Sequence, residues 1–340
     1  SRGLFHKAIL QSGCSLSQWA FQDNPREKAL LLARDLGCTS QDPDTILEFL
    51  MSVPAMDLVT SQYNETLLTK KDLVQKMSFI FSPCVEKYGN APFLSDYPRK
   101  LMERGEFAKV PIIIGLTDKE GMLVLAMKQP HFDHINNNPS VLVPQNLNMT
   151  PDKEEELRLG KEILKFYTNT DSVSWEVAPQ FVDLAADIHF AIPLQEARRY
   201  FLKQQIPVYS YLFTYTSPRA LSNSTLPLAY PDRAEQFVGC GASHGDELPY
   251  LFYFNITQCT IVPPNNDDKA FMSTFLKAWT TFAKNSNPNC KGLGVTWKPD
   301  DIEDSSYLIL GKMTKPLNGI PFSDRTEFWN GICEKYSYSY

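Results

Sequence analysis

The sequence contains no apolar run close to the roughly 20 residues that a membrane-spanning helix requires. It also contains no run of Lys and Arg, and 33 basic against 39 acidic residues give a net charge of −6. A surface that binds nucleic acid needs the opposite excess. None of the 7 cysteines belongs to a Cys-x-x-Cys pair, which argues against a zinc or thioredoxin-like site. We therefore expect no membrane span, no nucleic-acid partner and no metal.

The N-terminus lacks both an initiator Met and the basic-then-apolar segment of a signal peptide. We expect the chain to begin inside a domain. Four glycosylation acceptor motifs, at Asn64, Asn148, Asn223 and Asn255, together favour a protein that is secreted or passes through the secretory pathway. Disulfides form in that compartment, but the odd number of cysteines leaves at least one unpaired and the sequence does not give the connectivity.

Short apolar runs alternate with helical patterns along the chain. Apolar runs predict strands at 7–11, 110–115, 208–215 and 307–310, of which the second is rich in β-branched residues. Capping residues, acidic first turns and helical apolar spacing predict helices at 25–37, 43–51, 150–167, 175–202 and 267–284, the fourth interrupted near Pro193. Strands separated by helices indicate a doubly wound α/β sheet, where chemistry collects at the carboxyl ends of strands. The loops after Gly115 and around His244 are therefore the places to look for a site.

The segment Gly241-Ala-Ser-His-Gly245 is a literal G-x-S-x-G motif, the pattern of a serine nucleophile on a strand-to-helix turn. Its context does not fit that role. The residues before it are too few and too rich in glycine for a strand ending at Ser243, and no histidine follows His244 as the order of the triad requires. We interpret the glycines as a flexible loop that presents the His244 imidazole.

If His244 is a general base, the acid that orients it should come earlier in the chain, after a strand. Glu120 fits, because it follows the strand at 110–115 in a polar turn that ends in Gly121. Asp118 is the competing acid. Taken alone, Glu120 would be read as a solvated turn carboxylate and His244 as an ordinary loop or core histidine.

Four sequence blocks, in order, are similar to blocks of the type-B carboxylesterases and cholinesterases. They are SRGLFHKAILQSG at 1–13, FLSDYP followed by VPIIIGLTDKEG at 93–98 and 110–121, GASHGDELPYLF at 241–252, and WTTFAKNSNP at 279–288. The third block fits a general, insect-type esterase best. The resemblance runs along nearly the whole chain and implies an α/β-hydrolase fold, with residues 1–340 forming the C-terminal part of one catalytic domain.

The resemblance also implies roles for individual residues. Glu120 becomes the triad acid, His244 the base, and Ser12 a supporting residue that hydrogen-bonds the glutamate. Trp19 matches an aromatic residue that lines the acyl pocket, with ordinary core packing as the alternative. The nucleophile elbow of the family would end roughly a dozen residues before Ser1, so the serine and its oxyanion donors would lie outside this chain.

The function implied is hydrolysis of a small carboxylic ester through an acyl-enzyme, with no metal or organic cofactor, and this chain alone would be inactive. The alternative is a non-catalytic adhesion protein of the same fold, similar to neuroligins and glutactin. The resemblance puts one disulfide in doubt, because the partner position of Cys38 is Phe49. It also gives no counterpart for Cys14, Cys84 or Cys333.

A second cluster, His131-Phe-Asp-His134, places two imidazoles and a carboxylate close together, which could suggest a metal site. It lies in a stretch rich in Pro and Asn that does not fix the geometry of ligands. We therefore interpret it as a surface loop.

Overall fold

A five-stranded sheet is the centre of the computed structural model, which describes residues 3–62, 64, 67, 74, 81–87, 90–127, 131–144, 147, 152–254 and 261–336. Its strands lie in chain order: β1 (Ala8–Gln11), β2 (Ile112–Thr117), β3 (Val208–Phe213), β4 (Ser306–Leu310) and β5 (Lys315–Asn318). The first four run parallel and β5 is antiparallel to β4. Every residue of β2 and β3 is buried, as expected for parallel strands covered on both faces.

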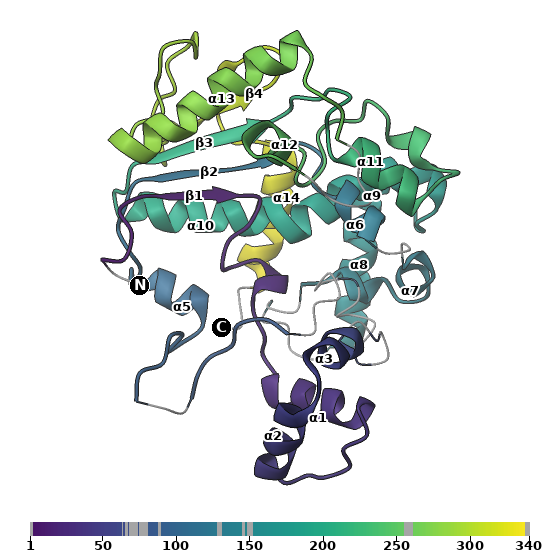
Figure 1. Ribbon diagram of the computed structural model, residues 1–340. Helices are drawn as coiled ribbons and strands as arrows, with labels where there is room; N and C mark the ends of the chain where they lie inside the picture. The colour runs from purple at the N-terminus through teal and green to yellow at the C-terminus, as the bar shows by residue number, and fades with distance from the viewer. Residues whose placement is uncertain are drawn as a thin grey trace.

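Helices cover the two faces of this sheet (Figure 1). Successive side chains of a strand point to opposite faces. Ile113 accordingly packs with the aromatic residues of α13 (Asn266–Asn285), while Ile112 and Ile114 pack with α10 (Ile192–Lys203) on the other side. The strands expected at 7–11, 110–115, 208–215 and 307–310 and the helix at 267–284 are confirmed within a few residues.

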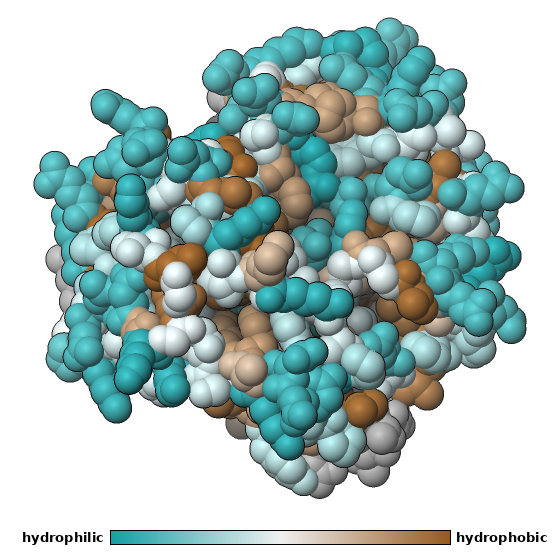
Figure 2. Space-filling view, turned by 90° about the horizontal axis from the view of Figure 1, so that it is seen from above, coloured by the Kyte–Doolittle hydropathy of each residue, from teal (hydrophilic) through white to brown (hydrophobic). Residues whose placement is uncertain are grey.

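The sequence of helix α13 contains residues that begin and end the helix. Asn265 and Asp268 make a reciprocal capping box at its start, and Ser286 ends it in the left-handed conformation. Its buried face carries Phe275, Trp279 and Phe282. Seen from above, the molecule is largely hydrophilic, with hydrophobic residues in small groups (Figure 2).

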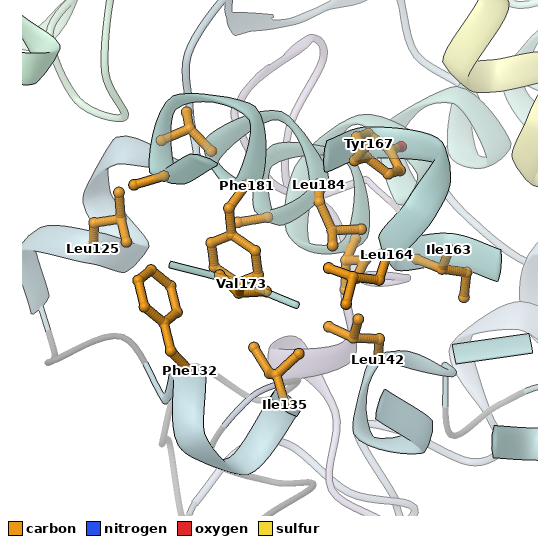
Figure 3. Close-up of a cluster of buried hydrophobic side chains, with 14 of the residues drawn as sticks. Leu125, Phe132, Ile135, Leu142, Ile163, Leu164, Tyr167, Val173, Phe181 and Leu184 are labelled. Carbon is orange, nitrogen blue, oxygen red and sulfur yellow. The ribbon is translucent and has the colours of Figure 1, made fainter. Parts of the chain in front are cut away.

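A helical layer follows the carboxyl ends of β2 and β3 (Figure 1). It contains α6 (Met122–Met127), α7 (Phe132–Asn137), α8 (Lys153–Thr168), α9 (Ala178–Ala186), α11 (Ser222–Ala229) and α12 (Leu248–Leu251). Side chains of α6 to α9 interlock in a buried cluster that includes Leu125, Phe132, Leu164 and Phe181 (Figure 3). This layer fixes the loops that leave the sheet.

The helices α1 (Pro25–Asp35), α2 (Pro43–Ser52), α3 (Ala55–Ser61) and α5 (Pro98–Glu103) lie below the sheet in Figure 1. The helix α14 (Ser323–Tyr336) starts at the level of the strands and runs downward. Short 3-10 turns occur at Gln18–Ala20, Pro139–Leu142, Trp175–Val177 and Ala234–Phe237. The first two helices and α8 confirm the helices expected at 25–37, 43–51 and 150–167.

One expectation about the helices is confirmed and one needs correction. The helical stretch from 175 to 202 is interrupted near Pro193: α9 ends at Ala186, a π-helical segment follows at Asp187–Ala191, and α10 begins at Ile192 with Pro193 in its first turn. The stretch around His131 and His134 is not a loop but the short helix α7, because Phe132 and Ile135 anchor it in the core. In the described part of the chain no helix is long and apolar enough to cross a membrane.

Candidate active site

The carboxylate of Glu120 and the imidazole of His244 meet at the carboxyl end of β2. Glu120 Oε2 lies 2.7 Å from His244 Nδ1, although the two residues are far apart in the sequence. The Glu120 side chain is fully buried, whereas 31% of the His244 side chain is exposed. A carboxylate that accepts from Nδ1–H leaves Nε2 of the neutral ring as a proton acceptor. The pair therefore has the geometry of a carboxylate-oriented general base.

The loops that carry the pair are tied together by backbone contacts. Asp118 accepts a hydrogen bond from Ala242 N at 2.7 Å, and Lys119 N donates to Ala242 O at 2.9 Å. Gly121 has to be glycine, because a Cβ there would lie 2.0 Å from the Val182 carbonyl oxygen on α9. Of the two acids that the sequence left open, Glu120 contacts the imidazole and Asp118 secures the histidine loop.

Two further donors hold the other oxygen of Glu120. Ser12 Oγ donates to Oε1 at 2.6 Å, and Thr117 N donates to the same atom at 2.6 Å. Ser12 is buried and has a positive φ of 57° at the end of β1, which turns its hydroxyl towards β2. The structure thus brings Ser12, Glu120 and His244 together as predicted. Their catalytic roles stay predictions.

Removing the Ser12 hydroxyl tests its contribution to the site. We expect Ser12→Ala in the full-length protein to lower kcat by roughly tenfold, because one charge-assisted hydrogen bond to the buried carboxylate is lost while Thr117 N still holds it. Steady-state kinetics would measure this. Ser15→Ala, on the same segment, is the matched control. A Ser12→Ala enzyme with the kcat of the control would show that Ser12 does not support the acid.

Trp19 reaches the site through Phe190 rather than directly. Its indole Nε1 donates to the His189 carbonyl at 3.1 Å, and its ring centroid lies 6.1 Å from that of Phe190. Phe190, which is buried, lies 4.8 Å from the His244 ring centroid with a tilt of 32°. Phe190 was not predicted from the sequence. It lies in the π-helical segment, where the spacing of a regular helix does not show which residues share a face.

Ser243 does not occupy a nucleophile elbow. The preceding residues form a 3-10 turn and a loop, and the last strand before Ser243 is β3, which ends at Phe213. Ser243 is buried, and its backbone N donates to Asp246 Oδ2 at 2.7 Å. The interpretation of the motif as a histidine-presenting loop is in agreement with this geometry.

Two acidic residues beside His244 were not singled out from the sequence. Asp246 accepts from Ser222 N, Ser222 Oγ and Ser243 N, so both its oxygens are bonded, and burial raises its pKa to about 6. Glu247 accepts from Gln11 Nε2 at 3.1 Å. Both residues are visible in the run Gly-Asp-Glu-Leu-Pro. They were not selected, because an acidic residue after a loop histidine is more often exposed to solvent.

The electrostatics of the site favour the charged imidazole. Burial lowers the pKa of His244, but the charge of Glu120, its hydrogen bond and the charges of Glu247 and Asp246 outweigh that effect, so the pKa is raised above its usual value. An imidazole with a raised pKa is a stronger base and a more stable imidazolium.

The other predicted residues lie apart from this site. Asn64 and Asn223 donate from their side-chain amides to Asp35 and to the Ser217 carbonyl, respectively. Asn148 and Asn255 lie outside the described residues. No group of His, Cys, Asp or Glu in the described ranges could hold a metal ion. No disulfide joins two of the described cysteines, so the expected disulfide is not found among them, and Cys259 lies outside the described residues.

Comparison with known proteins shows which family has a similar sequence. A model described as "Carboxylesterase family" matches residues 1–329. Esterase FE4 of Myzus persicae is 27% identical over 93% of this chain, and Cholinesterase of Mus musculus is 25% identical over 96% of it. Neuroligin-2 of Homo sapiens is 28% identical over 85% of the chain. The chain spans 54%, 51% and 32% of these proteins, about half the length of the two esterases.

Proposed function

Because this chain belongs to the carboxylesterase family, with its α/β-hydrolase fold, we propose that it supplies the acid and the base of a Ser-Glu-His triad that hydrolyses carboxylic esters. The observation that carries the proposal is the 2.7 Å contact between Glu120 Oε2 and His244 Nδ1. The serine nucleophile and the oxyanion donors belong to a segment of the full-length protein that precedes this chain. Residues 1–340 are then the C-terminal part of one catalytic domain.

The reaction follows from these positions. His244 Nε2 takes the proton of the serine hydroxyl as the oxygen attacks the ester carbonyl, and the imidazolium then gives that proton to the departing alcohol. Water attacks the resulting acyl-serine with the same base, which releases the carboxylic acid and the free serine. Glu120 orients the ring and stabilises the imidazolium. The substrate is a small-molecule ester, and the reaction uses no cofactor.

Aromatic side chains pack beside the base. Phe190 packs against the His244 ring and Trp19 packs against Phe190. We propose that Trp19 limits the acyl side of the substrate through this contact.

The four Asn-x-Ser/Thr motifs support glycosylation and a place in the secretory pathway or outside the cell. Asn223 is exposed on α11, so a glycan could attach there without entering the core.

Turnover of p-nitrophenyl acetate by the full-length protein and by this chain alone tests the proposal. The full-length protein should show steady turnover, and the chain alone none above buffer, because it lacks the nucleophile and β1 has only one neighbour, β2, among the described strands. Ser243→Ala in the full-length protein is the matched control and should keep most of the activity.

Turnover by the isolated chain that disappears in its Ser243→Ala variant would overturn the proposal. A full-length protein that is folded but inactive would favour the non-catalytic adhesion alternative instead.

A further inference from the structure

Lys119 stands directly before Glu120 and joins three parts of the molecule. It belongs to the acid loop (residues 118–121), and its backbone N donates to the Ala242 carbonyl oxygen at 2.9 Å, in the histidine loop (residues 241–245). Its Nζ donates to Asp183 Oδ1 on α9 at 2.8 Å. The two side chains are 26% and 24% exposed, so the ion pair is largely shielded from solvent.

The helix α9 contacts the acid loop on both sides of Glu120. On one side lies the ion pair of Lys119. On the other side lies Gly121, where a Cβ would come within 2.0 Å of the Val182 carbonyl oxygen and 2.9 Å of Ala186 N. The loop therefore rests on the backbone of α9 at Gly121 and is tied to it by charge at Lys119. The position of Glu120 depends on both contacts.

The aliphatic stem of Lys119 also packs against the histidine loop. Gly241 has a positive φ of 144°, and a Cβ there would lie 2.6 Å from Lys119 Cγ. The stem thus lies in close contact with the backbone three residues before His244. Because Asp183 holds the end of the side chain, the ion pair keeps the stem in this place between the two loops.

The C-terminal helix α14 holds Asp183 in turn. Arg325 NH1 lies 3.1 Å from Asp183 Oδ1, the same oxygen that accepts from Lys119. Arg325 NH2 donates to Asp187 Oδ1 at 3.1 Å, and the Asp187 side chain is 1% exposed. A surface ion pair with two free side chains contributes little, but here the carboxylate is fixed by a second cation that is itself anchored in the core.

We propose that Lys119 is a positioning residue that keeps Glu120 at hydrogen-bond distance from His244, by pairing with Asp183 on α9. This inference rests on the proposed function, in which Glu120 orients the base. Lys119 acts through the two loops that it joins and has no described contact with the imidazole. A carboxylate that moves away from Nδ1 leaves the ring free to turn from the orientation that proton transfer needs.

The test compares Lys119→Met with the wild-type full-length protein. Met keeps an unbranched apolar stem and removes the ammonium group. We expect kcat for p-nitrophenyl acetate to fall roughly fivefold with KM unchanged, because the loop is loosened while its backbone contacts remain. The low-field proton NMR signal of His244 Nδ1–H, assigned by its loss in His244→Ala, should move upfield as the bond to Glu120 lengthens.

Two further variants separate positioning from general stability. Lys119→Arg keeps the charge and can still reach Asp183, so it should restore both kcat and the NMR signal. Lys165→Met, which changes an exposed lysine on α8, is the matched control and should change neither. A Lys119→Met protein with a lower melting temperature but the kcat and NMR signal of this control would overturn the inference.

A double-mutant cycle tests the ion pair itself. Asp183→Asn should also lower kcat, and adding Lys119→Met to it should cause no further loss, because the pair is already broken. Losses that multiply would overturn the inference. Asp183→Asn alone serves as the test if Lys119→Met does not fold. A shifted NMR signal in a protein without turnover would sustain the positioning of Glu120 by Lys119 and reject the proposed esterase function.

Discussion

Replacing His244 with Ala in the full-length protein is expected to lower kcat for ester hydrolysis by roughly 10⁴- to 10⁶-fold. The imidazole is the group that can take the serine proton, and Glu120, which is fully buried behind it, is in no position to replace it. Without the base the serine attacks as a neutral alcohol, and the remaining rate comes from binding and the oxyanion donors. Stopped or steady-state assays with p-nitrophenyl acetate would measure the loss.

His6→Ala is the matched control, because His6 is exposed and lies before β1. It should keep wild-type kcat. If His244→Ala lowers kcat by less than tenfold while the protein stays folded, His244 is not the triad base.

Replacing Glu120 with Gln should cost roughly 10⁴-fold in kcat. The carboxylate accepts three hydrogen bonds in the structure, from Ser12 Oγ, Thr117 N and His244 Nδ1. An amide has one oxygen and one NH₂ group, so it cannot accept all three. Because Oε1 is bound by two donors, the NH₂ group would face His244 Nδ1 and stabilise the wrong tautomer, with the proton on Nε2.

Asp118→Asn is the comparison that the sequence itself suggests. Asp118 accepts from Ala242 N and does not reach the imidazole by any described contact, so its variant should lose far less kcat than Glu120→Gln. A larger loss in Asp118→Asn would reverse the assignment of the acid.

Local patterns predicted the frame of the molecule well. The buried strands β2 and β3 read as apolar runs, and α13 carries both its caps and its apolar face in sequence. The pairing of Glu120 with His244 followed from the order of residues in a similar family, because neither residue alone would be read as catalytic. The geometry then chose Glu120 over Asp118.

Other elements of the fold have only weak patterns in the sequence. The strand β5 is mostly exposed and contains Pro316, so it shows neither an apolar run nor a clean alternation. The helix α14 buries only Thr326, Trp329 and Ile332, too few to mark an apolar stripe. The interruption near Pro193 was expected from the proline, but its π-helical form was not.

The surroundings of His244 could not be predicted for a different reason. Phe190, Gln11 and Trp279 reach the site from three distant segments, and their contacts exist only once the sheet has formed. Trp19 illustrates the limit: both the pocket and the core interpretation fit the sequence, and the structure places its ring half-buried against Phe190.

We propose that Glu120 and His244 act on a serine supplied by a segment that precedes this chain. Labelling the full-length protein with a fluorophosphonate, followed by peptide mass spectrometry, tests it most directly, because the reagent marks the activated serine. We expect one adduct, on a serine upstream of residue 1, that persists in Ser243→Ala and is lost in His244→Ala. An adduct on Ser243 would contradict it.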